Sequence, residues 1–278
     1  MRFTPSTRIR PPEVAVRTLL CWALVLALLP LLALLLPLLA LQGRHTRRTA
    51  LRLPEAEGPS CGQLHPPDGA VGPPLHLLII GESPVAGVGV THHTDGAGPG
   101  MARPLAALSG RSVHWQCHGH NGLRLAGLLA RPLPDAPPRA DLVLVMMGVN
   151  DTTGLTRLRR WRHQLHQLVD TLQQRQPGAR IAFAPVPPMH RFTALPQPLR
   201  AVIGLRARQL DRVLRQVSAR RHCPVLDYGD PSDPALLAED GYHPSAAGFA
   251  AMGERLARQA IEKLPDLRQS EGEGGMPE

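Results

Sequence analysis

The chain has 278 residues, which is enough for one α/β domain with extensions but short for two domains. Its formal charge of +9 comes almost entirely from arginines, and aromatic residues make up only 3% of the chain. Binding of single-stranded nucleic acid relies on aromatic stacking, so this composition argues against a nucleic-acid partner. The four cysteines show no C-x-x-C spacing, which argues against a disulfide framework.

The N-terminal part of the chain predicts a membrane anchor. Residues 1–18 are basic, and residues 19–42 contain no charged side chain. Such a run is long enough for one transmembrane helix, whereas the apolar region of a cleaved signal peptide has only about 7–15 residues. We therefore expect an uncleaved signal-anchor helix and a single-pass membrane protein. Arginines flank the run on both sides, so the sequence does not indicate the orientation.

Residues 43–75 are rich in Arg and then in Pro and Gly, which predicts an extended linker. A domain over residues 76–264 follows, in which short apolar runs alternate with segments of helical periodicity. The predicted strands are 76–80, 112–117, 142–147, 180–185 and 224–228. Strands that alternate with helices favour a parallel sheet covered on both faces, so we predict a five-stranded parallel sheet in a three-layer α/β/α sandwich. Residues 265–278 are expected to form a disordered tail.

The run 142–147 predicts the centre of this sheet. Its residues are all apolar, and the run is too short for a helix, as is typical of a strand buried on both faces. Gly148 ends it, and Asn150 and Asp151 follow. Because open α/β sheets bind ligands beyond the carboxyl ends of their strands, this polar pair is a candidate for a functional site.

Three further residues at such positions suggest acyl-transfer chemistry. Ser83 follows the first strand in a Gly-rich turn that exposes its hydroxyl. His243 can take the proton of that hydroxyl, and Asp240, three residues earlier, can hold the imidazole in the required tautomer. The sequence therefore predicts a catalytic group of Ser83, His243 and Asp240.

The same edge of the sheet offers hydrogen-bond donors for the oxyanion that develops during acyl transfer. The candidates are the backbone N–H groups of Ser83 and Gly122 and the side-chain amide of Asn150. Gly119 and Gly127 lie close to Gly122 and are alternatives to it. Loss of one such donor typically costs about 2.7–4 kcal/mol in activation free energy.

Each of these features has a simpler interpretation when taken alone. A serine beside glycines is most often only a turn residue, and an isolated Asn-Asp pair most often caps a helix. Most Asp and His residues lie in surface loops. The joint occurrence of four such features, each beside a predicted strand or helix end, favours catalysis.

The order of these motifs resembles that of the SGNH (GDSL-like) hydrolase family. The similar stretches are GES at 81–83, the glycine at 122, GVND at 148–151 and DGYHP at 240–244. The resemblance implies a flavodoxin-like sheet of order 2-1-3-4-5, a Ser83 nucleophile, an Asp240–His243 pair and esterase or lipase-like activity without a metal or cofactor. Glu82 departs from the family pattern, which usually reads GDS at this position.

We therefore expect a membrane-anchored serine esterase that cleaves an acyl or acetyl ester through a Ser-His-Asp triad. The alternatives are a non-catalytic binding or scaffold protein that keeps the fold and an acyltransferase that uses the same site. A G-x-S-x-G motif at 58–62 lies in the predicted linker and lacks the strand and helix that such a nucleophile needs. The histidines around 114–120 lack the ligand spacing of a metal site.

Overall fold

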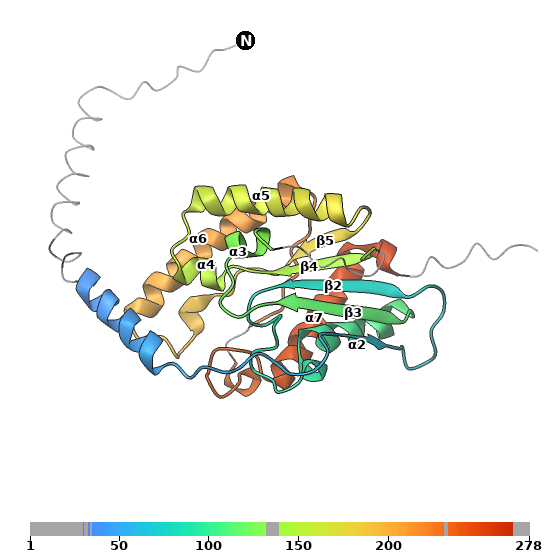
Figure 1. The fold of residues 1–278 in the computed structure, drawn as a ribbon, viewed down its shortest axis with the longest axis horizontal. Helices are drawn as coiled ribbons and strands as arrows, with labels where there is room; N and C mark the ends of the chain where they lie inside the picture. Colours follow the sequence, from blue (N-terminus) through green and yellow to red (C-terminus); the bar gives the residue numbers. More distant parts are fainter. Residues whose placement is uncertain (1–29, 31–32, 34, 132–138, 231–232, 269–278) are drawn as a thin grey trace, which may run out of the picture. The chain divides into compact units, whose positions relative to one another are not determined.

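The computed structural model describes residues 30, 33, 35–131, 139–230 and 233–268. The chain divides into two compact units, Met1–Ala50 and Leu51–Glu278. In the first unit, residues 35–49 form a helix. The second unit contains a five-stranded sheet and the helices that cover it (Figure 1).

The prediction of a transmembrane anchor is corrected by the structure. Much of the predicted span 19–42 lies outside the described residues, as do the basic segment 1–18 and most of the predicted tail. Among the helices that are described, none combines the length and apolar character that a bilayer crossing requires. The helix over 35–49 runs on into Arg44, Arg47 and Arg48. The described helices therefore do not support a single-pass membrane protein.

The sheet has the order β1-β3-β2-β4-β5. Its strands are β1 (Cys61–Leu64), β2 (Leu75–Gly81), β3 (Val113–Gly119), β4 (Leu142–Met146) and β5 (Arg180–Phe183). β3, β2, β4 and β5 pair in parallel, in the order that the family resemblance implies for its first four strands. β1, however, pairs with β3 in the antiparallel direction. The sheet is mixed, and the prediction of an all-parallel sheet is wrong.

Two local features explain this difference. β1 lies in the stretch predicted as a linker, and its residues are mostly exposed and show no apolar alternation. Within the described residues, the predicted strand 224–228 makes only one bridge, between Phe183 and Val225. The next donors on either side of that bridge would be Pro185 and Pro224, and proline has no N–H group. The pairing therefore cannot extend into a fifth parallel strand.

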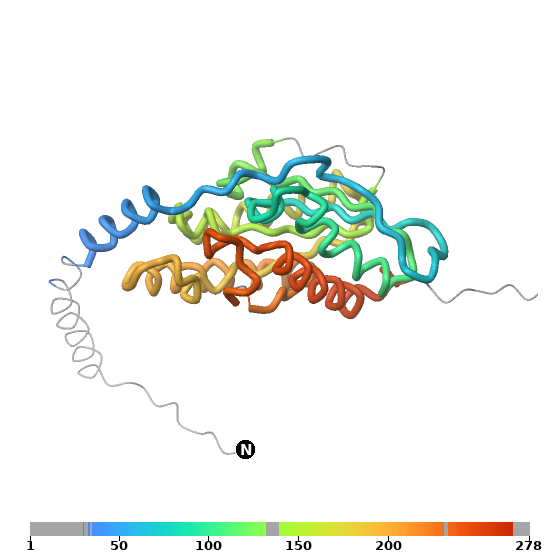
Figure 2. Tube along the Cα trace, turned by 90° about the horizontal axis from the view of Figure 1, so that it is seen from below, coloured from blue at the N-terminus to red at the C-terminus, as the bar shows by residue number. Residues whose placement is uncertain are grey.

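Helices cover both faces of the sheet (Figure 1). They are α2 (Ala97–Ser109), α3 (Leu125–Leu129), α4 (Val149–Thr153), α5 (Leu158–Arg175), α6 (Leu199–Arg220) and α7 (Ala246–Lys263). Leu78 and Ile80 of β2 pack in one core cluster with residues of α3, α5 and α6, whereas Leu77 and Ile79 pack in a second cluster with α2 and α7. Successive residues of a strand point to opposite faces, so these two clusters mark the two helical layers. α2 and α7 lie side by side (Figures 1 and 2).

β4 occupies an inner position in the sheet, as the apolar run predicts. All five of its residues are buried, and it lies between β2 and β5. The parallel strands β2, β3 and β4 all end at one edge of the sheet. Ser83, Gly122 and Asn150 each follow one of these strands, so the topology brings three distant segments to a common edge.

Candidate active site

Ser83 lies in a tight turn directly after β2. The backbone N–H of Val85 donates to the carbonyl oxygen of Glu82 at 2.9 Å. A Cβ atom at Gly81 would lie 2.2 Å from the carbonyl oxygen of Met146. Only glycine therefore allows β2 and β4 to approach each other this closely. The chain therefore turns sharply and places Ser83 beyond the carboxyl end of the sheet.

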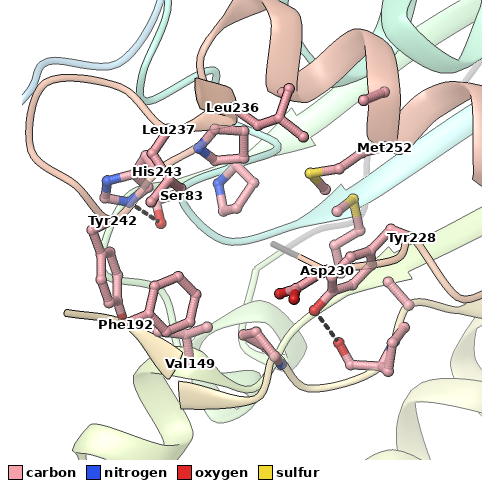
Figure 3. Close-up of a pocket in the computed structure, with 18 of the residues that line it drawn as sticks. Ser83, Val149, Phe192, Tyr228, Asp230, Leu236, Leu237, Tyr242, His243 and Met252 are labelled. Carbon is pink, nitrogen blue, oxygen red and sulfur yellow. Dashed lines mark hydrogen bonds between the residues drawn. The ribbon is translucent and has the colours of Figure 1, made fainter. Parts of the chain in front are cut away.

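The structure brings the Ser83 hydroxyl and the His243 imidazole together. The distance from Ser83 Oγ to His243 Nε2 is 2.9 Å (Figure 3). The other ring nitrogen, Nδ1, lies 2.6 Å from Asp240 Oδ2. The three side chains thus form a continuous chain of hydrogen bonds, although 160 positions separate Ser83 from His243 in the sequence.

Asp240 is held by its own loop. Its Oδ1 atom accepts hydrogen bonds from the backbone N–H groups of Tyr242 and His243, at 2.9 and 3.0 Å. Burial opposes ionisation of this carboxyl group, but the hydrogen bonds from His243 and from the two backbone groups outweigh that effect and hold its pKa below the usual value. Asp240 is therefore ionised at neutral pH and accepts a hydrogen bond from the imidazole.

The glycine-rich segment after Ser83 explains how the His243 loop can lie so close to that segment. Gly89 has a φ of +109°, and a Cβ atom there would lie 2.2 Å from the carbonyl oxygen of Pro244 and 3.2 Å from Cβ of His243. A side chain at this position would push the His243 loop away from Ser83. The glycine therefore permits the contact between two segments that are distant in the sequence.

Glu82, the departure from the usual GDS pattern, is buried and contacts the segment after β4. Its Oε1 atom accepts a hydrogen bond from the backbone N–H of Val149 at 2.8 Å. Its Oε2 atom accepts from the backbone N–H of Asn150 at 2.9 Å and from Asn150 Nδ2 at 2.6 Å. Burial raises the pKa of Glu82 to about 7. No pattern in the sequence indicates these contacts.

The structure separates the three glycines considered for the oxyanion site. Gly119 ends β3, where a Cβ atom would lie 2.3 Å from the backbone nitrogen of Ala86, and Gly127 lies within α3. Gly122 has a φ of +74° in the turn after β3, and its Cβ position faces open space. Close packing explains Gly119, whereas the positive φ angle explains Gly122. Its role as a donor stays a prediction.

A cavity of about 350 Å³ opens beside Ser83 and His243. Its lining is largely apolar and includes Met147, Val149, Phe192, Leu237 and Met252. Tyr228 also lines the cavity, and its hydroxyl donates to the carbonyl oxygen of Pro185 at 3.1 Å. Met252 and Tyr228 lie across the cavity from Ser83 and His243 (Figure 3). A substrate group bound here would be surrounded mainly by hydrocarbon.

Asp151, the second residue of the predicted polar pair, makes hydrogen bonds that hold neighbouring segments together. It is fully buried and accepts hydrogen bonds from the backbone N–H of Leu125, at 2.9 Å, and from the Thr156 hydroxyl, at 2.6 Å. It joins the start of α3 to the segment after α4. Only Asn150 of this pair remains a candidate for the chemistry.

The histidines near β3 form two edge-to-face ring pairs, His76 with His114 and His118 with His120. In the parts of the chain that are described, no three His, Cys, Asp or Glu side chains gather closely enough to hold a metal ion. These histidines therefore pack against one another.

The sequence profile of the GDSL-like Lipase/Acylhydrolase family matches residues 79–251, which is more than half of the chain. The chain belongs to this family. The match confirms the resemblance seen in the sequence. The matched region begins in β2 of this GDSL-like protein and ends within α7, so it includes Ser83 and His243.

One curated relative of the GDSL-like chain is the GDSL-like esterase Rv1075c of Mycobacterium tuberculosis (strain ATCC 25618 / H37Rv). The two sequences are 29% identical over 205 residues. The aligned region covers 69% of this chain and 65% of the relative. The chain thus spans somewhat less than two thirds of the relative's length.

Solved structures share the fold. A lipase/acylhydrolase from Enterococcus faecalis is 19% identical, with a TM-score of 0.51, and the alignment covers 68% of this chain and 96% of that one. A carbohydrate esterase family 2 enzyme from Corynascus thermopiles (Myceliophthora fergusii) is 20% identical, with a TM-score of 0.55, and the alignment covers 70% of this chain and 68% of that one. At these identities, the similarity supports the GDSL-like fold alone.

Proposed function

We propose that this GDSL-like protein hydrolyses an acyl ester through an acyl-enzyme formed on Ser83. The observation that carries the proposal is the chain of hydrogen bonds from Asp240 through His243 to Ser83, which ends at an apolar cavity. Nucleophile, base and a third group that orients the base are the parts that a serine esterase needs.

In the first half of the proposed reaction, Ser83 Oγ attacks the ester carbonyl carbon while His243 Nε2 takes the hydroxyl proton. Asp240 stabilises the imidazolium that forms. Negative charge develops on the carbonyl oxygen, and the backbone N–H groups of Ser83 and Gly122 and the amide of Asn150 are the proposed donors to it. The carbon–oxygen bond to the alcohol then breaks, and the alkoxide leaves with the proton from His243.

In the second half, water takes the place of the alcohol. His243 Nε2 accepts a proton from the water, whose oxygen attacks the acyl carbon of the Ser83 ester. Collapse of the second tetrahedral intermediate breaks the bond to Ser83 Oγ, which recovers a proton from His243. The products are a carboxylic acid and an alcohol, and the enzyme returns to its starting state.

The cavity lining indicates an aliphatic acyl group. Burial of one methylene contributes roughly 0.8 kcal/mol, so two additional methylenes in contact with side chains such as Met147 and Met252 correspond to about a tenfold gain. We expect kcat/KM for nitrophenyl butyrate to exceed that for nitrophenyl acetate by about this factor. Steady-state kinetics on the two esters test this, and equal values would show that the acyl group binds outside the cavity.

A fluorophosphonate probe tests the nucleophile independently of substrate choice. Such a probe reacts with an activated serine hydroxyl, so mass spectrometry of the digested protein should place the label on Ser83. Ester turnover with no label on Ser83 would require another nucleophile. Absence of both turnover and label would favour the scaffold alternative.

A further inference from the structure

Glu82 joins two parts of the site. It directly precedes Ser83, and its side chain reaches the first residues of α4, which carry Asn150. The three hydrogen bonds that described residues make to its carboxylate all come from N–H groups, and the side chain is buried. The N-cap residue of α4 is Gly148, which has no side chain to accept a hydrogen bond at the start of this helix. Glu82, which directly follows the neighbouring strand β2, therefore accepts the hydrogen bonds that a local cap would otherwise accept.

The contact at Asn150 Nδ2 determines which way the amide points. A flipped amide would turn its oxygen toward the Glu82 carboxylate and place two acceptors face to face. With the amide as observed, one N–H of Nδ2 donates to Glu82 Oε2. The second N–H has no acceptor within the described part of the chain. Under the proposed function, that N–H is the one left to donate to a substrate oxygen.

We propose that Glu82 is a positioning residue, which fixes the Asn150 amide as an oxyanion donor beside Ser83. The inference rests on the proposed function, because it needs Asn150 to act on the developing oxyanion. Glutamine at position 82 has one acceptor oxygen and an NH₂ group. It would place a donor against the N–H groups of Val149 or Asn150, and so release the amide from its present orientation.

A double-mutant cycle tests whether Glu82 acts through Asn150. We expect Asn150→Ala to lower kcat by about 10²-fold or more, because it removes one oxyanion donor. Glu82→Gln should lower kcat by about tenfold in the wild-type background, with little change in KM. In the Asn150→Ala background, the same change should cost less than about threefold, because residues that act as a unit are not additive.

The other outcomes of this cycle contradict the inference, and they can be told apart from one another. A tenfold loss from Glu82→Gln in both backgrounds would show that Glu82 acts independently of Asn150. An Asn150→Ala protein with full activity would remove the oxyanion role of Asn150, while labelling of Ser83 would leave the esterase proposal intact. If Glu82→Gln does not fold, Glu82→Asp enters the same cycle, since it keeps the charge and shortens the side chain.

Asp151→Asn is the matched control for Glu82→Gln. Asp151 is also a buried carboxylate that accepts from a backbone N–H group and lies beside Asn150 in sequence, but its partners are Leu125 and Thr156. Its replacement should lower the melting temperature and leave kcat within about twofold of wild type. A loss of kcat equal to that of Glu82→Gln would mean that any disturbance near α4 reduces activity, and this would contradict a specific role for Glu82.

The pH dependence provides a readout that a purely structural residue would not change. Burial, together with the nearby charge of Asp151, raises the pKa of Glu82 to about 7, while the hydrogen bonds from Asn150 and Val149 oppose this shift. Among the described residues, Tyr228 and Tyr242 interact electrostatically with Glu82, and His243 lines the same cavity. The raised pKa means that Glu82 loses its charge as the pH falls through about 7, and the protonated side chain then resembles glutamine.

The kcat ratio of wild type to Glu82→Gln should therefore fall from about tenfold at pH 8 to about twofold at pH 6. Any ionisation that affects both proteins equally cancels in this ratio. Measurement of kcat for both proteins across this range decides the point. A ratio that stays constant from pH 6 to pH 8 would contradict the requirement for a charged Glu82.

Discussion

Replacing Ser83 with alanine is expected to lower kcat for a nitrophenyl ester by about 10⁴- to 10⁶-fold. The change removes the oxygen that would form the acyl-enzyme, and no other described hydroxyl donates to His243 Nε2. His243→Ala should cause a loss of similar size, because the hydroxyl then has no base within reach. The double variant should be no worse than either single one, since the two residues act as a unit. Single-turnover and steady-state kinetics on purified proteins measure these effects.

Ser112→Ala is the matched control for this prediction. Ser112 also lies beside a histidine, with its Oγ atom 2.8 Å from His65 Nδ1. It precedes β3, however, at the end of the sheet opposite to Ser83. We expect this variant to keep wild-type kcat. Turnover by Ser83→Ala at the wild-type rate would refute the mechanism, and loss of activity in Ser112→Ala would show that the assay reports on folding.

Asp240→Asn is expected to lower kcat by about 10³- to 10⁴-fold while the protein remains folded. The Asp240 carboxylate accepts from His243 Nδ1 and thereby leaves Nε2 free to take a proton from Ser83. An asparagine amide can donate to Nδ1 instead, which would select the tautomer with its proton on Nε2 and no capacity to act as a base. It would also lose the charge that stabilises the imidazolium. The asparagine oxygen can still accept from the backbone of the loop, so stability should change little.

Kinetics of this variant should therefore show a fall in kcat with a nearly unchanged KM and melting temperature. Asp227→Asn is a suitable control, because Asp227 also accepts from a backbone N–H two residues later, that of Gly229, at 2.8 Å. It has no histidine partner among the described contacts. A loss in Asp240→Asn no greater than in Asp227→Asn would exclude Asp240 from the proton-transfer chain.

Motif order was sufficient to predict the residues that meet at the site. Ser83, Asp240 and His243 were predicted from their positions after strands and before a helix, and the structure places them in hydrogen-bonding contact. The role of Glu82 could not be predicted in the same way. A glutamate beside a serine is compatible with an exposed turn, and only the pairing of β2 with β4 reveals that its carboxylate faces Asn150.

The errors in the fold have equally specific causes. The strand β1 has an exposed, irregular sequence and is recognisable only through its hydrogen bonds to β3. Residues 224–228 have the composition of a buried strand, but prolines on both sides of the Phe183–Val225 bridge prevent a ladder. The transmembrane prediction rested on hydropathy alone, and no helix in the described ranges has the length and apolar character to satisfy it.

The sequence by itself determined the α/β class, the buried strand β4 and the side chains that are proposed to react. Apolar runs, helical periodicity and residues at the ends of strands are local signals, and a linear pattern carries them directly. Only the tertiary structure decided the direction of the edge strand, the apolar cavity and the contact between Glu82 and Asn150. Each of these depends on hydrogen bonds or packing between segments far apart in the chain, and such pairings leave no period in either segment alone.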